Sequence, residues 1–378
     1  MAVTPTGKFL KDIQFGLHGV FKCLNCSQET PQAMTFQCPS CSGAMELSYP
    51  NISNAEFIGT GMNRYKDLLP LGNYIYPDAH STLQKLVDLP GVFAKNDGDL
   101  PTGNTKFRQA SIAVPAFWAG GINEIVVAST GNSSNSYCYE AQLHPGHLGV
   151  HVFVPKTHQG RIRFLNPYVD LHVTDSDFME TGNTAKAYAK RHNLSTDGGF
   201  YNPYRREGLK TAYLEAIEQF VAQNGSSPDY FIQAISSGMG VIAAHSAFRQ
   251  ALQLGWIDRI PAMIVVQQET CAPMVKADRD NRPAISENDI ERNPEGLAAA
   301  ILRGNPTVSY PYVRKVVKTT GGRFVSVSAD ELRASKATLA DQKIRACFAA
   351  AATHSAAYQL REELKGKSGV IMITGSKD

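Results

Sequence analysis

The feature that most constrains the fold is an alternation of short β-branched runs with longer helix-like stretches, which begins near Leu86. Strand-like runs occur at 92–95, 125–128, 150–154, 168–173, 230–235, 262–267, 324–327 and 370–373, and helix-like stretches include 133–143, 207–223, 241–254 and 344–364. This order is typical of parallel sheets, because each crossover between parallel strands needs a helix-length connection. We therefore expect an α/β fold whose parallel sheets are covered by helices on both faces.

Two Cys-x-x-Cys pairs lie in the first fifty residues, in turn-rich surroundings unlike the rest of the chain. Cys23 and Cys26 form one pair, and Cys38 and Cys41 form the other, with eleven residues between them. Four thiolates can surround one tetrahedral ion, and zinc suits sulfur ligands. Because four sulfurs fill the coordination sphere, we expect a structural zinc ribbon without a catalytic water. Four ordinary buried cysteines or a redox pair are the alternatives.

A lysine follows a predicted strand and opens a predicted helix. Residues 101–108 read Pro-Thr-Gly-Asn-Thr-Lys-Phe-Arg, which places Lys106 at a strand-to-helix turn. The segment lacks the Gly-x-x-x-x-Gly-Lys spacing of a nucleotide phosphate loop. A single lysine after a loop is usually a solvated surface residue, so Lys106 alone predicts no function.

Three further segments place polar groups after predicted strands. Residues 129–136 read Ser-Thr-Gly-Asn-Ser-Ser-Asn-Ser, more than a helix N-cap needs, and their hydroxyl and N–H donors suit a carboxylate or a phenolic oxygen. Residues 236–241 read Ser-Ser-Gly-Met-Gly-Val ahead of a predicted helix, a sequence that suits a phosphate. The last predicted strand is followed directly by Thr374.

In this order, these segments resemble those of threonine synthase and its relatives, the second fold type of pyridoxal-phosphate enzymes. Residues 202–211, Asn-Pro-Tyr-Arg-Arg-Glu-Gly-Leu-Lys-Thr, are very close to a family motif, and residues 64–70 resemble the family's Arg-Tyr entry segment. The resemblance covers nearly the whole chain, since some microbial threonine synthases also carry a zinc ribbon. It implies two parallel-sheet αβα domains of the tryptophan synthase β and threonine synthase type. We expect a zinc-ribbon-like segment at 1–50, a large cofactor-binding domain at 51–108 and 204–378, and a small mobile α/β domain at 109–203.

The resemblance also implies roles for individual residues. Lys106 is expected to bind pyridoxal phosphate covalently and to act as the catalytic base, with Asn132 at the phenolic oxygen of the cofactor and Thr374 at its pyridine nitrogen. The expected contacts to the cofactor phosphate come from Ser236, Ser237, Gly238, Met239 and Gly240. The expected substrate-binding residues are Thr105, Ser129, Thr130, Ser133 and Ser134, with Asn202, Arg205 and Lys210 as candidates for a substrate phosphate, because arginine can bind phosphate through two parallel hydrogen bonds. Surface charge at a helix N-terminus is the alternative for these last three.

The expected activity is that of a lyase in amino-acid biosynthesis, which uses pyridoxal phosphate for elimination or replacement on a phosphorylated amino acid. The threonine-synthase-like form converts O-phosphohomoserine and water to threonine and phosphate. The alternatives are a cysteate-synthase-like replacement on phosphoserine or another activated serine, a threonine or serine dehydratase, and a catalytically silent relative. The chain departs from the family pattern at Phe107, Gln109 and the Cys347-Phe348 pair, so the substrate stays open.

Charge and composition narrow the partners. A net charge of +3 is too small to predict binding to nucleic acid or to a membrane surface. No apolar run is long enough to span a bilayer, and residues 1–4 lack the build of a signal peptide. Seven cysteines, an odd number, fit a reducing compartment. We therefore expect a cytoplasmic enzyme, and a homodimer by analogy with the family.

Overall fold

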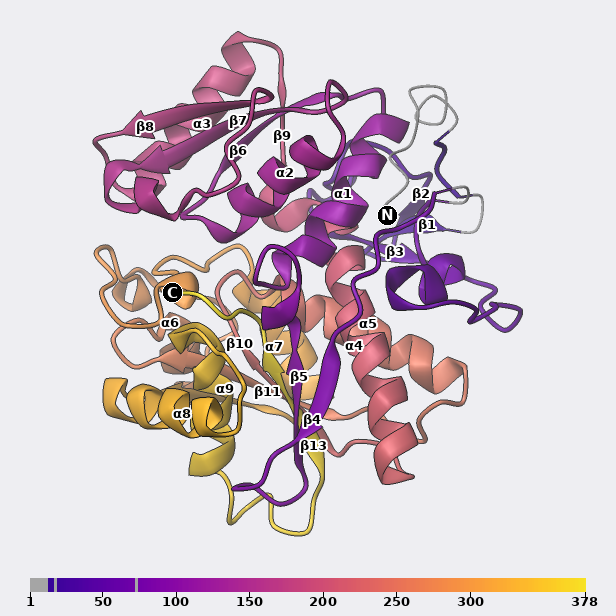
Figure 1. Cartoon of the computed structure of the whole chain (residues 1–378), viewed down its shortest axis with the longest axis vertical. Helices are drawn as coiled ribbons and strands as arrows, with labels where there is room; N and C mark the ends of the chain where they lie inside the picture. The colour runs from indigo at the N-terminus through magenta and orange to yellow at the C-terminus, as the bar shows by residue number, and fades with distance from the viewer. Residues whose placement is uncertain (1–12, 17–18, 72–73) are drawn as a thin grey trace. The chain divides into compact units, whose positions relative to one another are not determined.

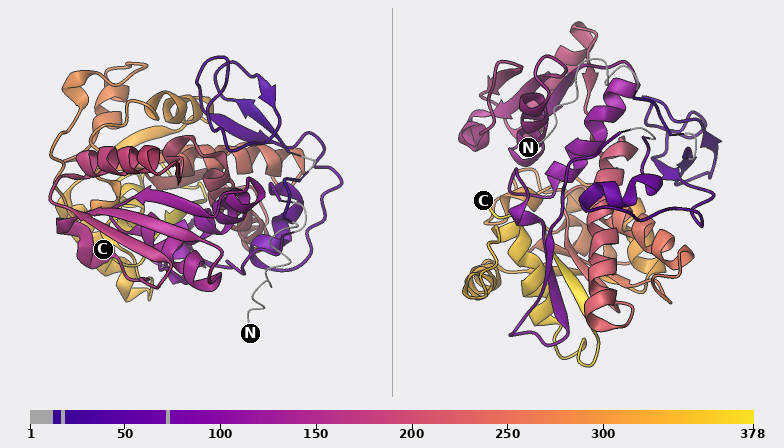
Figure 2. Two further views of the ribbon diagram at one scale, coloured as in Figure 1. Left: turned by 90° about the horizontal axis from the view of Figure 1, so that it is seen from above. Right: turned by 45° about the vertical axis from the view of Figure 1, so that its right-hand side comes forward.

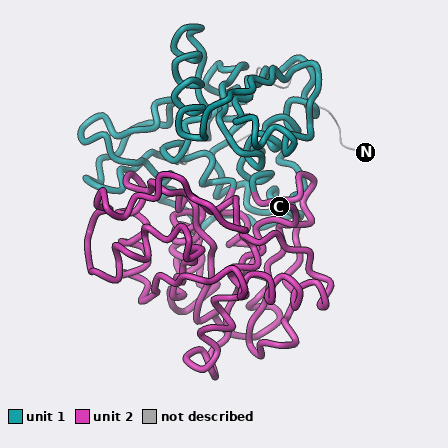
Figure 3. Tube along the Cα trace, turned by 90° about the vertical axis from the view of Figure 1, so that its left-hand side faces the viewer, with its two compact units in different colours: residues 1–79, 106–208 teal, residues 80–105, 209–378 magenta. Residues whose placement is uncertain are grey.

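The computed structural model describes residues 13–16, 19–71 and 74–378, so the expectation about a signal peptide at residues 1–4 lies outside the described residues. The chain divides into two compact units (Figure 3). Unit 1 comprises residues up to Ala79 together with Lys106–Gly208, and unit 2 comprises His80–Thr105 and Leu209–Asp378. The domain boundaries expected from the sequence remain a prediction.

Unit 2 is built on a six-stranded sheet (Figure 1). Its strands, in spatial order, are β12 (Arg323–Val327), β11 (Ala262–Gln268), β10 (Tyr230–Ala234), β13 (Gly369–Ile373), β5 (Val92–Asn96) and β4 (Thr82–Lys85). All neighbours are parallel except β4, which pairs antiparallel with β5 at the edge. Every residue of β5, β10 and β13 is buried, as expected for central strands covered on both faces.

Helices cover both faces of this sheet (Figures 1 and 2). They are α4 (Pro203–Asn224, which begins in unit 1), α5 (Met239–Gln253), α6 (Pro273–Arg279), α7 (Tyr310–Thr319), α8 (Ala329–Asp341) and α9 (Phe348–Gln359). Alternate residues of β10 face opposite layers. The Phe231 ring lies 4.8 Å from that of Phe248 on α5, whereas Ile232 belongs to the core that contains the alanines of α9.

The helix expected at 344–364 is shorter at both ends. Lys343 adopts a left-handed φ of 63° and Cys347 is extended, so α9 begins only at Phe348. The Cys347 N–H donates to Gly375 O at 2.9 Å, which ties this segment to the end of the chain instead of to a helical turn. Beyond Leu360 the chain forms turns.

Unit 1 contains a parallel sheet and a small antiparallel one. The parallel sheet has the order β8 (Val169–Thr174), β7 (Gly149–Pro155), β6 (Glu124–Ala128) and β9 (Ser195–Thr196), accompanied by α1 (Lys106–Ala119), α2 (Asn132–Leu143) and α3 (Phe178–Arg191). The antiparallel sheet has the order β2 (Glu29–Thr30), β1 (Val20–Cys23) and β3 (Met45–Ser48) and carries the cysteine pairs. The expected fold class, α/β with two parallel sheets, is confirmed.

The cysteine-bearing sheet is attached to the start of α4 by buried contacts. The Tyr204 ring lies 5.6 Å from the ring of Phe21 and 6.2 Å from that of Phe36. Arg206 donates to the Met45 carbonyl, and the Tyr49 hydroxyl donates to Glu207 at 2.6 Å. These residues therefore hold the N-terminal sheet against the helix.

Candidate active site

Three of the segments singled out in the sequence gather at one edge of the unit 2 sheet. Strands β10, β13 and β5 are parallel neighbours in the sheet, so their carboxyl ends lie at the same edge. The segment 97–105 follows β5, Thr374 follows β13, and the glycine-rich loop 236–240 follows β10. In open α/β sheets, ligands bind outside the carboxyl ends of the strands. This edge is therefore the candidate cofactor site of unit 2.

The segment before Lys106 is docked on the end of the chain. The Thr105 N–H donates to Thr374 O at 2.9 Å, and the Ser376 N–H donates to Gly103 O at 3.0 Å. The Ser376 hydroxyl also donates to Gly98 O at 2.8 Å. Lys106 is the residue directly after Thr105 and the first residue of α1. Lys106 therefore directly follows a segment that is fixed within unit 2 by hydrogen bonds to residues 374–376.

The glycine-rich loop has the geometry of an anion-binding helix start. Gly238 has a left-handed φ of 76° and precedes the first residue of α5. The first N–H groups of a helix have no partner within it and carry partial positive charge, which suits a phosphate. At Gly240 a Cβ would lie 3.0 Å from the hydroxyl of Tyr213, which donates to Gln233 at 2.7 Å. Glycine at position 240 thus lets the first turn of α5 pack closely against the Tyr213 hydroxyl.

Lys106 lies beside a charged cluster within unit 1. Burial lowers the pKa of Lys106 from its usual 10.5 to about 7; the Arg205 cation also lowers it, and the Asp197 carboxylate acts in the opposite direction. Arg205 Nη1 lies 2.7 Å from Asp197 Oδ2, and Nη2 donates to Ser133 Oγ at 3.3 Å. When the Gln109 amide is turned so that its oxygen faces Arg205, that oxygen accepts hydrogen bonds from Arg205 Nε and Nη2, both at 2.8 Å.

Asp197 and Gln109 are functional candidates that the sequence reasoning missed. Gln109 lies three residues after Lys106, so both occupy the same face of α1, and this spacing could have indicated it. Asp197 follows the two-residue strand β9 and meets Arg205 only through the tertiary fold, so no local pattern indicated it.

The first turn of α2 contains a buried hydroxyl that has no hydrogen-bond partner among the described residues. The Ser129 hydroxyl accepts the N–H groups of Gly131 at 3.2 Å and Ser134 at 3.4 Å, which sets the turn. Ser134 is fully buried and its own Oγ is unpartnered. A buried group of this kind usually binds an ordered internal water. Thr130 and Asn132, in the same turn, are partly exposed, so this loop fits a bound carboxylate or cofactor oxygen.

The motif at 202–211 has mostly structural contacts. Asn202 accepts the Tyr204 N–H and donates to Asp197 O, both at 2.9 Å, so its amide caps α4 and holds the Asp197 backbone. Gly208 is packed directly against the carbonyl of Arg108, which leaves no room for a Cβ. Lys210 is fully buried on the unit 2 part of α4. A substrate role for Asn202 and Lys210 stays a prediction, and in this motif Arg205 is the residue connected to Lys106.

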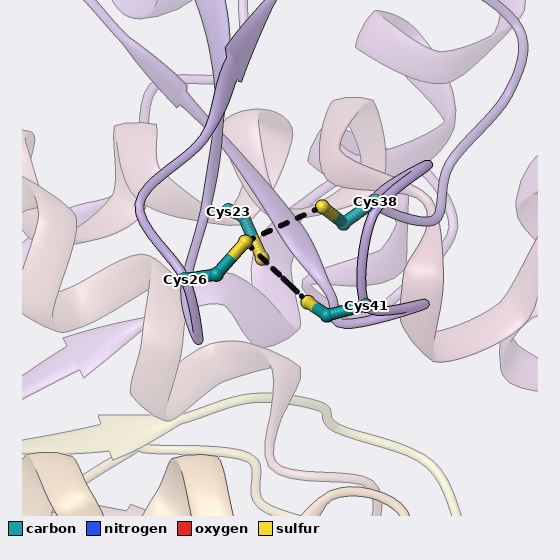
Figure 4. Close-up of side chains that lie close together, drawn as sticks. All are labelled: Cys23, Cys26, Cys38 and Cys41. Carbon is teal, nitrogen blue, oxygen red and sulfur yellow. Dashed lines mark hydrogen bonds between the residues drawn. The ribbon is translucent and has the colours of Figure 1, made fainter.

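The four cysteines converge on one point (Figure 4). Their sulfurs all lie within 4.8 Å of one another, with Cys23 and Cys41 at 3.5 Å and Cys26 and Cys38 at 3.6 Å. Zinc–sulfur bonds of about 2.3 Å in a tetrahedron place sulfurs about 3.8 Å apart. The cluster is therefore compatible with a zinc ion bound by four thiolates, without a position for a catalytic water.

The protein has an α/β fold with a candidate ligand edge at the carboxyl ends of the unit 2 strands, and unit 1 carries a lysine of lowered pKa. The family model described as pyridoxal-phosphate dependent enzyme matches residues 79–375, and the chain belongs to this family. The expected family and cofactor class are thereby confirmed.

Individual relatives are consistent with membership of this family. A threonine synthase of Methanosarcina acetivorans is 28% identical over 342 residues, which cover 84% of this chain and 81% of the relative. A cysteate synthase of Methanoculleus marisnigri is 25% identical over 336 residues, which cover 83% and 77%. The structure of maize serine racemase matches with a TM-score of 0.66 at 15% identity, covering 78% of this chain and 88% of that one, and supports the fold. The protein is thus a pyridoxal-phosphate-dependent enzyme similar to threonine synthase. Among the described residues, no helix is long and apolar enough to cross a bilayer.

Proposed function

We propose that the protein catalyses elimination or replacement on the activated side chain of an amino acid, in the manner of threonine synthase. The first candidate reaction converts O-phosphohomoserine and water to threonine and phosphate. The observation that carries the proposal is Lys106, whose pKa is lowered to about 7 and which follows the loop docked on Thr374. The similarity to threonine synthase over most of the chain supports it.

Pyridoxal phosphate, when bound, supplies a ring that stabilises negative charge at the α-carbon of an attached amino acid. We propose that Lys106 Nζ binds the cofactor, takes the α-proton of the substrate and later returns a proton to the product. A base works best when its pKa is near the working pH, and a pKa of about 7 meets that condition. An exposed lysine of ordinary pKa would stay protonated at neutral pH, so it could neither attack the cofactor nor take the α-proton.

In this proposal, the remaining predicted residues bind the cofactor and the substrate and orient them. The N–H groups of the loop 236–240 would hold the cofactor phosphate, and Asn132 its phenolic oxygen. Thr374 would place a neutral hydroxyl at the ring nitrogen, which favours elimination and replacement over transamination. The loop from Ser129 to Ser134, with Thr105, would hold the substrate carboxylate, and the partial exposure of Ser129, Thr130 and Ser133 supports that role.

Other parts of the prediction remain proposals. The cysteine cluster would hold a structural zinc ion through Cys23, Cys26, Cys38 and Cys41. Residues 109–203 would form a small domain that moves on substrate binding, the assembly would be a homodimer, and the enzyme would work in the cytoplasm.

A second candidate reaction is replacement at the β-carbon of phosphoserine or another activated serine, which the similarity to a cysteate synthase supports. A dehydratase that acts on threonine or serine is the third. A panel of phosphorylated and acetylated amino acids, together with free threonine and serine, given to the holoenzyme, separates them. Phosphate release from O-phosphohomoserine supports the first reaction, release from O-phosphoserine the second, and a keto acid formed from threonine the third. No turnover of any of these compounds would contradict the proposal.

A further inference from the structure

Arg205, the candidate ligand for a substrate phosphate, is already occupied within the chain. Its side chain is 6% exposed and pairs at 2.7 Å with Asp197, which is 13% exposed. Nε and Nη2 both point at the Gln109 oxygen at 2.8 Å, and Nη2 is also 3.3 Å from Ser133 Oγ. The fork of parallel N–H groups that arginine offers to a phosphate is therefore taken up by a carboxylate and an amide.

Asp197 is fixed at this position by contacts on three sides. Its Oδ1 accepts the Gly199 N–H at 3.1 Å, and its backbone carbonyl accepts the Asn202 side chain at 2.9 Å. Its own N–H donates to the carbonyl of Val126 on β6 at 3.1 Å. The carboxylate is thus part of the wall of the site, and turning it away from Arg205 would break the turn that begins at Asp197.

The charge of the pair has a consequence for the leaving group. A buried guanidinium with one carboxylate is close to neutral, so a phosphate dianion that approaches Arg205 gains little attraction and meets Asp197 as a like charge. An uncharged acyl group meets no such repulsion and can still accept a hydrogen bond from the guanidinium or from Ser133.

We infer that Asp197 is a specificity-determining residue, which lowers the preference of the Arg205 subsite for phosphate esters relative to acyl esters of the same amino acid. The inference rests on the proposed function, because it concerns the leaving group of that reaction. Asp197 acts through Arg205 and does not itself perform the chemistry.

The test is Asp197→Asn in the holoenzyme, assayed with O-phosphohomoserine and O-acetylhomoserine. Asparagine has almost the same shape, keeps one acceptor oxygen, which can serve either Gly199 or Arg205, and removes the charge. We expect the ratio of kcat/KM for the phosphate ester to that for the acetyl ester to rise at least about tenfold. The control is Asp175→Asn, which removes the same charge from an exposed pair with Lys156 in unit 1 and should leave the ratio unchanged.

A change in the opposite direction tests the same idea if Asp197→Asn does not fold. Gln109→Glu keeps the shape and the acceptor for Arg205 and adds a negative charge, so the phosphate-to-acetyl ratio should fall. An unchanged ratio in either folded variant overturns the inference, even if kcat/KM falls for both esters. A purely structural role would lower kcat/KM for both substrates alike and leave their ratio unchanged.

Failure of the proposed function would be visible separately. If the wild-type holoenzyme turns over neither ester, inorganic phosphate is titrated by calorimetry into the wild-type and Asp197→Asn holoenzymes, whose cofactor-phosphate loop is filled. Tighter phosphate binding by the variant supports the inference, and equal affinity overturns it.

Discussion

A buried ion pair in unit 2 joins strand β5 to helix α4. Lys95 on β5 is fully buried, and its Nζ donates to Ser81 O at 2.6 Å, to Glu215 at 2.8 Å and to Gln219 at 3.0 Å. The second oxygen of Glu215 lies 2.8 Å from His80 Nδ1 and accepts the Ser81 N–H at 3.3 Å. Replacement of Glu215 therefore removes the counter-ion of Lys95 and also the contacts to His80 and Ser81, the residues that precede β4.

Glu215→Leu leaves a buried ammonium group without its carboxylate. Breaking a buried pair in this way costs about 3–5 kcal/mol of the free energy of unfolding, because the remaining charge is uncompensated. Glu215→Gln keeps an acceptor and should cost about 1–3 kcal/mol. The double replacement of Lys95→Met with Glu215→Leu removes both charges and should recover most of the loss, since apolar groups of similar size often replace a buried pair without cost.

Urea unfolding, followed by two spectroscopic probes whose transitions must coincide, measures these differences. Glu363→Gln is the control, because it breaks an exposed pair with Arg323 in unit 2 and should cost no more than about 1 kcal/mol. The reasoning is refuted if Glu215→Leu costs as little as this control, or if the double variant is as unstable as Glu215→Leu.

Further predictions concern the amine, the metal and the motif. Because the pKa of Lys106 is about 7, the rate at which the apoenzyme takes up pyridoxal phosphate should rise with pH through about 7, as the neutral amine forms, and then level off; a midpoint near 10 would contradict the burial argument. Metal analysis should find about one zinc ion per chain, and Cys26→Ser should lose it; metal-replete protein without zinc would exclude the ribbon site. Gly208→Ala should lower the thermal midpoint by several degrees, since its Cβ would meet the Arg108 carbonyl, whereas alanine at exposed Gly160 should not; equal midpoints would show that the helices can move apart.

The strands could be predicted because their sequences match their surroundings. Residues 92–94, 230–232 and 370–373 are apolar runs, and the structure buries all of them. The edge strand β4 could not be predicted, because Thr82–Lys85 is mostly polar and exposed and depends on its pairing with β5. The start of α9 was missed because the hydrogen bond from Cys347 to Gly375 joins residues that are distant in sequence.

Sequence patterns indicated candidate site residues where one residue type stands in a recognisable loop, as for Lys106 and the cysteines, and their roles stay predictions. The motif at 202–211 was recognised, but its sequence could not separate structural residues from functional ones. Tyr204 and Glu207 hold the N-terminal sheet, whereas Arg205 forms an ion pair with Asp197 in the charged cluster beside Lys106. Asp197 could not be found, because only the folded chain brings it to Arg205.

The measurement that tests the central claim most directly is reduction of the holoenzyme with borohydride, followed by peptide mapping. We predict a pyridoxyl group on Lys106, and no stable adduct in Lys106→Ala, whose circular dichroism should match that of the wild type. Attachment to a different lysine, or a folded protein that binds no pyridoxal phosphate, would contradict the account.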